Sequence, residues 1–380
     1  MKISILKNVL NEAIQNVSKA VSSRTTIPIL SGIKVDVTHS GVTLTASDTD
    51  ISIQSFIPTE AGDDVLVQTI RTGSVVLPSK FFSEIVKKLP SQEVEIEVIE
   101  HFHTFIRSGS TEIQMVGLDP EEYPVLPSIE ENHVFSVSGD LLKTMIRQTV
   151  FAISTTESSP ILTGVLWNLK GSQLKFVATD RHRLASRQAN IQADEQIQFG
   201  NVVISGKTLN ELSKIVPDQD TVVDIVVADN QVLFKVDHVL FYSRILEGTY
   251  PDTSKIIPQT FETELIMDTK QFTDAIDRAY LLSREEKTNI VRLQTLDNGT
   301  IEISSSSSEL GKVTEQVEAK HYAGQPLKIS FNSKYMLDVL KVIDSESIHL
   351  GFSGAMKPII VKPTDHVESQ HLILPYRTTN

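Results

Sequence analysis

The 380-residue chain carries a formal net charge of −13, has 40% hydrophobic residues and contains no cysteine. This composition is typical of a soluble globular protein of two or three domains, and it excludes disulfides and thiolate metal sites. No apolar run approaches the roughly 20 residues of a membrane helix and no secretory signal is visible, so we expect a cytoplasmic protein with no membrane partner.

The predicted helices cover residues 7–20, 79–89, 138–152, 205–216, 268–282 and 333–344. Their apolar residues recur with the 3.6-residue period of an amphipathic helix. Short alternating segments between them, at 35–37, 42–46, 94–99 and 232–236, predict half-buried antiparallel strands. We therefore expect an α+β fold in which two helices pack on strands in each domain. Proline-rich stretches at 120–128 and 250–258 divide the chain into domains 1–128, 129–258 and 259–380.

The chain also contains an internal repeat, which indicates three copies of one unit. Residues 28–30 (PIL) recur at 160–162, and the Ala-Ser/Thr-Asp sequence at 46–48 recurs at 178–180. A Lys-acid-Lys pattern with spacing i, i+4, i+7 occurs three times at steps of 127 residues, and this spacing places the charges on one helical face. The matching residues are Lys80, Glu84 and Lys87, then Lys207, Glu211 and Lys214, then Lys334, Asp338 and Lys341.

Positive charge is concentrated in the helices. The predicted helices hold 13 Lys and Arg residues against 9 Asp and Glu residues, so the rest of the chain carries a net charge of −17. A single charged helical face is usually only solvated. Six helices of the same character, in three matched pairs, indicate a shared environment.

We expect this environment to be the inside of a ring. Helices pack about 8–10 Å apart, so twelve helices from two chains would leave a hole roughly 25 Å wide. Such a hole admits a B-form duplex, whereas the six helices of one chain would leave less than about 10 Å. We therefore predict a homodimer with helices inside and strands outside, whose lysines make weak, sequence-independent contacts to phosphates.

Local sequences support this interpretation. The most specific are residues 24–30 (RTTIPIL), 178–184 (ATDRHRL), 247–252 (EGTYPD) and 374–377 (LPYR). Together with the repeat, they make the chain resemble, over essentially its whole length, the bacterial DNA polymerase III beta subunit family of sliding clamps. The resemblance implies a non-catalytic processivity factor of the DNA polymerase III holoenzyme. It also implies three clamp domains per chain and a closed ring formed by a head-to-tail dimer.

The resemblance implies a hydrophobic pocket between the second and third domains that receives a short linear motif. Its partners would be the replicative polymerase alpha subunit, the clamp loader, translesion polymerases and mismatch-repair proteins. Apolar residues would supply the anchor pocket, with His182 and the arginines as donors at its rim. The matching positions are Leu162, Thr179, Arg181, His182, Arg183, Leu184, Pro251, Ile256, Pro358, Leu372, Ile373, Leu374, Pro375, Tyr376 and Arg377.

The chain departs from the family pattern at two points in this region. Arg181 stands where a small residue is usual, which would narrow or recharge one wall of the pocket. The chain also continues through residues 378–380, past the end of some family members. Both departures bear on which motifs the pocket prefers.

The same mapping gives candidates for DNA contact and for dimerisation. Arg24 matches a family residue that touches double-stranded DNA. In the dimer, Ile113 and Met115 on a first-domain edge strand would meet Leu281 and Leu282 of the partner's third domain. The predicted helices supply the remaining DNA-contact candidates: Lys7, Lys19, Lys80, Lys87, Lys143, Arg147, Lys207, Lys214, Lys334 and Lys341.

The hypothesis that the protein is an enzyme has weaker support in the sequence. Gly206-Lys207-Thr208 resembles the end of a P-loop, but the position five residues before Gly206 is Asn201 and not glycine. His101 and His103 would share one face of a strand without a third ligand at metal-site spacing. Asp180 and His182 lack a nucleophile-elbow sequence. We therefore expect no catalytic residue, metal or cofactor. One alternative is a hydrolase or nucleotidyltransferase built on a repeated scaffold. The other is a protein-binding scaffold that does not bind DNA.

Overall fold

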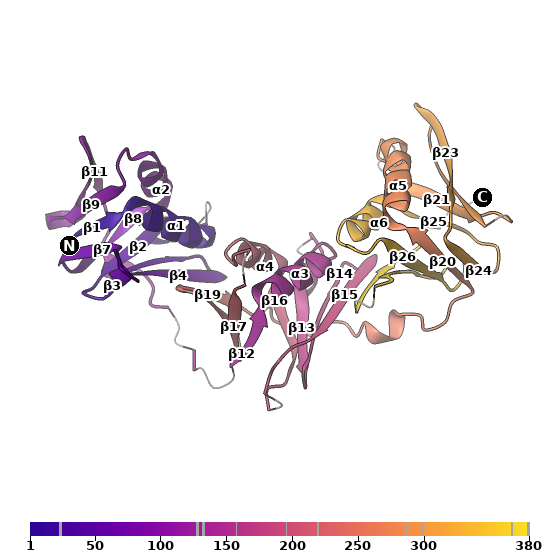
Figure 1. Cartoon of the computed structure of the whole chain (residues 1–380), viewed down its shortest axis with the longest axis horizontal. Coiled ribbons are helices and arrows are strands. Elements are labelled where there is room, and N and C mark those ends of the chain that lie inside the picture. The colour runs from indigo at the N-terminus through magenta and orange to yellow at the C-terminus, as the bar shows by residue number, and fades with distance from the viewer. Residues whose placement is uncertain are drawn as a thin grey trace. The chain divides into compact units, whose positions relative to one another are not determined.

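A computed structural model describes residues 1–22, 25–126, 129–130, 134–156, 158–194, 196–218, 220–285, 288–297, 299–365 and 368–377. The chain divides into two compact units. The first unit comprises Met1–Asp140 and Glu211–Ile245, and the second comprises Leu141–Asn210 and Leu246–Asn380. Figure 1 labels many of the elements of both units.

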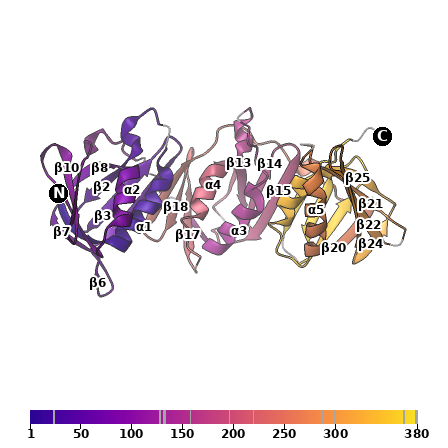
Figure 2. The ribbon, with the colours of Figure 1, turned by 90° about the horizontal axis from the view of Figure 1, so that it is seen from above.

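The first unit contains two larger antiparallel sheets and a small ribbon. Helices α1 (Lys7–Val17) and α2 (Ser79–Lys88) lie side by side, with α1 packed on β3 and β4 (Figure 1, Figure 2). The eight-stranded sheet has the order β12 (Val134–Ser138), β17 (Val222–Val227), β18 (Gln231–Val236), β19 (Val239–Arg244), β4 (Ile51–Pro58), β3 (Gly41–Ser47), β2 (Gly32–Val37) and β8 (Gly73–Pro78). The five-stranded sheet has the order β11 (Thr111–Val116), β10 (His103–Ser108), β9 (Glu93–Val98), β1 (Lys2–Leu6) and β7 (Val67–Arg71), and the ribbon pairs β5 (Glu60–Ala61) with β6 (Asp64–Val65).

The second unit has the same kind of architecture. Helices α5 (Thr269–Ser283) and α6 (Ser333–Leu340) pack together, and α5 covers β21, β22 and β23. The nine-stranded sheet has the order β16 (Phe199–Ser205), β13 (Gly164–Lys170), β14 (Gln173–Thr179), β15 (Arg183–Asn190), β28 (Ser369–Ile373), β27 (Ile359–Pro363), β26 (Ser347–Phe352), β20 (Thr263–Asp268) and β24 (His321–Gly324). The four-stranded sheet has the order β23 (Gly311–Glu318), β22 (Thr300–Ser307), β21 (Ile290–Thr295) and β25 (Lys328–Asn332).

The helix positions confirm the predicted helices and their repeat. Helices α2, α4 (Gly206–Ser213) and α6 begin at residues 79, 206 and 333, which are 127 residues apart. Helix α3 (Gly139–Val150) and α5 follow α1 at comparable spacing. The PIL sequences form two matching 3-10 turns, Pro28–Ser31 and Pro160–Thr163. The sequence repeat therefore corresponds to equivalent helices and turns at equivalent positions along the chain.

The apolar faces of these helices are buried as their periodicity predicts. Leu10, Ile14 and Val17 of α1 are fully buried, as are Phe272 and Ile276 of α5. Each buried aliphatic side chain contributes about 1.5–3 kcal/mol to folding by leaving water, so the stripes hold the helices on their sheets. Strands such as β4 alternate buried and half-buried residues, which leaves their other face toward solvent.

The predicted middle domain contributes strands to both large sheets. Its β19 pairs with β4 of the predicted first domain, from Val239 opposite Ser55 to Ser243 opposite Ile51. Its β15 pairs with β28 of the predicted third domain in the same antiparallel way. Backbone hydrogen bonding therefore continues across both predicted domain boundaries, which explains why the chain forms two compact units although the repeat is threefold.

Candidate functional site

A cavity of about 340 Å³ lies in the second unit beside the paired strands β15 and β28, and we name it the β15–β28 pocket. Its eight lining residues all belong to the predicted peptide pocket. Five of them are apolar, so the cavity offers a largely apolar surface to a side chain that enters it. The lining residues are Thr179, Arg181, Arg183, Leu184, Ile256, Pro358, Leu372 and Leu374.

The turn between β14 and β15 sets the wall of this pocket. One carboxylate oxygen of Asp180 accepts hydrogen bonds from the backbone N–H groups of His182 and Arg183, each at 2.9 Å. The Thr179 hydroxyl accepts from the Arg181 N–H at 3.1 Å and donates to the Arg183 carbonyl at 2.7 Å. These side chains fold the turn back on itself, as Asp and Thr commonly do. Arg181 takes a left-handed backbone with φ of +76°, which favours glycine.

Arg183, which the sequence predicted as a donor at the pocket rim, lines the pocket, but its guanidinium is engaged in buried ion pairs. Its side chain is only 8% exposed and lies 3.0 Å from the Asp180 carboxylate and 2.6 Å from that of Asp338. A third nitrogen donates to the Phe151 carbonyl at 2.6 Å, and the guanidinium lies over the Tyr335 ring at 4.5 Å. The guanidinium also lies 5.5 Å from the centroid of the Phe151 ring. Two carboxylates and two rings therefore fix this cation in the wall of the pocket.

Other predicted pocket residues divide between the cavity rim and the core. Leu162 is buried in a cluster with Leu184 and Leu372, directly behind the pocket. Ile373 does not line the cavity, because alternation along β28 turns its side chain into a different core cluster. Pro375 is half-buried, and the exposed residues are His182, Pro251, Tyr376 and Arg377.

The segment after β28 is held in place by backbone hydrogen bonds. The Leu374 N–H donates to the His182 carbonyl at 2.9 Å, and the Tyr376 N–H donates to the Ser330 carbonyl at 2.7 Å. Pro375 forms an isolated bridge with Phe331. The LPYR sequence is therefore anchored beside the pocket. Residues 378–380 lie outside the described residues.

Some residues of this site were not predicted from the sequence. Ser159 accepts a hydrogen bond from Nη2 of Arg181 at 2.7 Å. Tyr250 accepts one from the Thr179 N–H at 3.0 Å, and burial raises the pKa of its hydroxyl. Asp338 was recognised only as part of the Lys-acid-Lys pattern. Nothing in the local sequence connects it with Arg183, 155 residues earlier.

The predicted DNA-contact lysines differ in their surroundings. The Nζ of Lys7 donates to the Leu89 carbonyl at 2.5 Å, and burial lowers the pKa of Lys19. These two lysines are therefore partly engaged within the protein. Arg147 pairs with Asp344 at 2.5 Å, and Lys143 is half-buried. The lysines of the threefold pattern are exposed: Lys80, Lys87, Lys207, Lys214, Lys334 and Lys341. Arg24 lies outside the described residues.

The acids of the threefold pattern have different partners. Glu84 lies 3.0 Å from Lys88, which with Lys87 lowers the pKa of its carboxyl. Glu211 lies 2.8 Å from Lys214. Asp338 instead turns toward Arg183, and its carboxylate is 3.8 Å from Lys334.

The predicted dimer residues are half-buried or exposed. Ile113 and Met115 are half-buried on β11, which is an edge of the five-stranded sheet. Leu281 is exposed and Leu282 half-buried near the end of α5. In the four-stranded sheet that α5 covers, β23 is likewise an edge.

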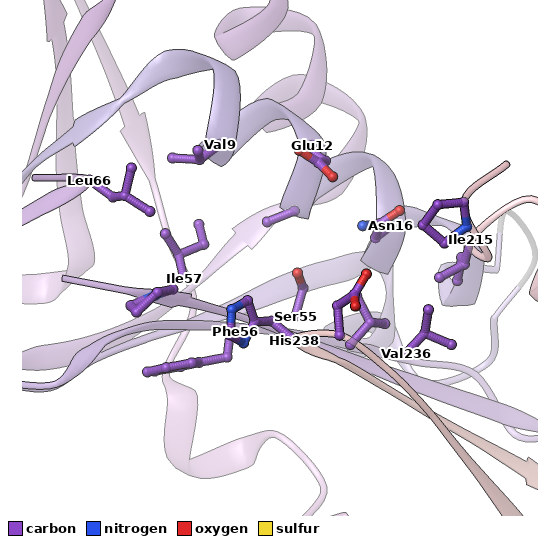
Figure 3. A pocket seen from close by; sticks show the side chains of 15 residues that line it. Val9, Glu12, Asn16, Ser55, Phe56, Ile57, Leu66, Ile215, Val236 and His238 are labelled. Atoms are coloured by element: carbon purple, nitrogen blue, oxygen red, sulfur yellow. The ribbon is translucent and has the colours of Figure 1, made fainter. Parts of the chain in front are cut away.

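A second cavity, of about 410 Å³, lies in the first unit. Figure 3 shows Val9, Glu12 and Asn16 of α1 on one side and Phe56 and Ile57 of β4 on the other. Its lining includes none of the residues predicted to contact DNA, peptide or a partner chain. The cavity therefore gives no support to those assignments.

The predictions about metal and nucleotide sites have mixed outcomes. His101 lies in a 3-10 turn with φ of +57° and not in a strand with His103, so the predicted shared face was wrong. Among the described residues, no group of three or more His, Asp and Glu side chains could hold a metal ion. Residues 202–204 form part of β16, where a P-loop needs a phosphate-binding loop. No helix in the described part of the chain is long and apolar enough to span a membrane.

Comparison with known proteins agrees with the repeat and with the fold. Models of the DNA polymerase III beta subunit match residues 1–127 (N-terminal domain), 136–252 (central domain) and 254–377 (C-terminal domain). The chain is 52% identical to the beta sliding clamp of Halalkalibacterium halodurans and 53% identical to that of Bacillus subtilis, and each match covers all of both chains.

Solved structures give the same result. The chain superposes on the DNA polymerase sliding clamp of Bacillus subtilis with a TM-score of 0.97 at 53% identity, covering all of both chains. For the DNA polymerase III beta chain of Streptococcus pneumoniae the TM-score is 0.95 at 37% identity, covering 99% of this chain and all of the other. The chain has the three-domain fold of the sliding clamps, and it belongs to the DNA polymerase III beta subunit family, whose members are non-catalytic processivity subunits.

Proposed function

We propose that two copies of this chain close head to tail into a ring that encircles duplex DNA and holds a replicative polymerase on it. The observation that carries the proposal is the threefold helix. Helices α2, α4 and α6 begin 127 residues apart. Each has one exposed lysine in its first turn and a second exposed lysine seven residues later, which lies within α2 but directly after the ends of α4 and α6. Three equivalent cationic helices in an acidic chain fit a common task of facing phosphates.

The contacts to DNA would be weak and independent of sequence. Lysines on flexible stems bind phosphate as point charges and carry no base readout. The best candidates are the six exposed pattern lysines, followed by Arg147 and Lys143 of α3. Lys7 and Lys19 would contribute less, because their ammonium groups bind backbone carbonyls. Acidic strands and loops would discourage DNA from binding elsewhere on the protein.

Ring closure would pair two open sheet edges. Strand β11 of one chain would meet β23 of the other, because each is the edge of its own sheet and carries unpaired backbone groups. Ile113 and Met115 would pack against Leu281 and Leu282 of the second chain. A head-to-tail contact of this kind joins two different surfaces, one from each chain. The assembly forms a closed ring when successive rotations from one chain to the next lead back to the first chain.

The β15–β28 pocket would receive linear motifs of partner proteins. An apolar cavity of about 340 Å³ fits one or two large side chains of an extended peptide. The expected partners are the polymerase alpha subunit, the clamp loader, translesion polymerases and mismatch-repair proteins, in the bacterial cytoplasm. We take the domains as 1–128, 129–258 and 259–380, which places the pocket at the junction of the second and third.

The mass in solution tests the ring. One chain has a mass of 42.2 kDa, and light scattering coupled to gel filtration should give about twice that value. A strict monomer at micromolar concentration would contradict the ring, since one chain supplies too few helices to surround a duplex.

A further inference from the structure

The two arginines of the β15–β28 pocket differ in how their charge is balanced. Arg183 lies between the carboxylates of Asp180 and Asp338. Arg181 is exposed and donates to the neutral hydroxyl of Ser159. No carboxylate in the described part of the chain forms an ion pair with Arg181. The pocket therefore has one cation with donors left for a ligand.

The backbone holds Arg181 in a conformation that its side chain does not favour. Its φ of +76° places a Cβ-bearing residue in the left-handed region. The hydrogen bonds of Thr179 and Asp180 within the same turn enforce this conformation. A strained residue on the wall of a ligand cavity points to a role in binding.

The rest of the cavity selects what can lie beside this cation. Leu184, Ile256 and Leu372 are among the apolar lining residues and require apolar anchors. A carboxylate next to such anchors would reach Arg181 in a partly desolvated setting, where a charge-assisted hydrogen bond is stronger than in water. We propose that Arg181 makes the pocket selective for peptides that carry Asp or Glu beside their apolar anchors. The proposal rests on the proposed peptide-binding function.

The repeat offers a natural comparison in the first unit. The residue 132 positions before Arg181 is Thr49, in the turn that follows β3. It lines a cavity of about 240 Å³ together with Asp48, Asp50 and Arg244. Two carboxylates against one arginine leave this lining with a net negative charge, which disfavours an acidic peptide, and the lining lacks the leucines of the β15–β28 pocket. Of the two repeat-related cavities, only the β15–β28 pocket therefore suits an acidic peptide.

Three labelled peptides test the assignment. They share the sequence Gly-Leu-Xaa-Leu-Phe-Gly, with Asp, Asn or Lys at Xaa, and their dissociation constants are measured by fluorescence anisotropy. For the unaltered protein in about 50 mM salt we expect the Asp peptide to bind about three- to tenfold more tightly than the Asn peptide, and the Lys peptide most weakly. In about 500 mM salt the preference should shrink, because the pair lies at the protein surface.

Variants separate the effect of the Arg181 charge from the effect of the shape of the pocket. Arg181→Gln should bring the Asp-to-Asn ratio to about one, and Arg181→Lys should restore part of the preference. Arg244→Gln removes the same charge from the repeat-related cavity and should leave the ratio unchanged. An Asp preference that survives in Arg181→Gln, or equal binding of the Asp and Asn peptides by the unaltered protein, overturns the inference while the pocket stands. If no peptide binds the unaltered protein, the peptide-binding function itself fails.

Discussion

Replacing Asp338 by alanine tests the buried ion pair that joins α6 to the β15–β28 pocket. The Asp338 carboxylate lies 2.6 Å from a side chain, Arg183, that is almost fully buried. Removing one partner of a buried pair costs about 3–5 kcal/mol when the other charge is left alone. Arg183 keeps the Asp180 carboxylate at 3.0 Å. We therefore expect a smaller loss in the free energy of unfolding, of about 2 kcal/mol.

The single tryptophan of the chain makes this loss measurable. Trp167 is fully buried in β13 and stacks on Phe176 at 3.9 Å, in the same unit as Arg183. Its fluorescence in urea titrations should report the unfolding of that unit. Asp344→Ala is the control, because it removes the partner of Arg147 at a site where the carboxylate is 69% exposed. That variant should lose less than about 1 kcal/mol, and equal losses for both variants would refute the reasoning.

Three further predictions concern pH, the pocket and the dimer. Burial lowers the pKa of His371 to about 3 from an ordinary value of 6.5, so its stabilising contribution is full above pH 6.5 and should fall by about 1.4 kcal/mol per pH unit on acidification toward pH 3. His371→Gln should flatten this dependence in urea titrations between pH 7 and 4.5, unlike His39→Gln at an exposed site; an unchanged slope in His371→Gln would show that the imidazole is not the titrating group. Leu374→Asp places a charge in the apolar wall and should weaken peptide binding at least about tenfold, whereas Leu310→Asp, at an exposed turn, should not; equal affinities would remove Leu374 from the site. Ile113→Asp on β11 should yield monomers by light scattering, while Ile70→Asp on β7, the opposite edge of that sheet, should stay dimeric; a dimer in both cases would exclude β11 as the interface.

Helix positions could be predicted from the sequence because their signal is local. The stripe of Leu10, Ile14 and Val17 needs only the helical period, and these three side chains are fully buried. The step of 127 residues between Lys80, Lys207 and Lys334 needs only comparison of the chain with itself. Both signals lie in the residue pattern of each helix and do not depend on contacts between distant parts of the chain.

Features that depend on distant residues could not be predicted in this way. Arg183 was assigned as a donor at the pocket rim from its neighbours in the sequence. The sequence did not reveal that Asp338 and the Phe151 carbonyl already accept hydrogen bonds from its guanidinium. Ile373 was assigned to the pocket with Leu372. Alternation along the strand sends these two adjacent side chains to opposite faces, and only the pairing of β28 with β15 decides which face is which.

The backbone conformation of particular residues also could not be predicted from the sequence. Arg181 was noted for its charge, while its left-handed φ follows from hydrogen bonds within the turn. His101 was expected in a strand with His103, but a 3-10 turn from Glu100 to Phe102 interrupts the sheet there. Such turns depend on the local balance of backbone hydrogen bonds, which alternating composition does not encode.

Retention on DNA of different topology tests the central proposal most directly. The protein is loaded on a nicked circular duplex, excess protein is removed by gel filtration, and half of the sample is linearised with a restriction enzyme. A ring held by topology, with only weak lysine–phosphate contacts, should stay on the circle and leave the linear DNA through its ends. Equal retention on both forms, or equal loss from both, would contradict the account.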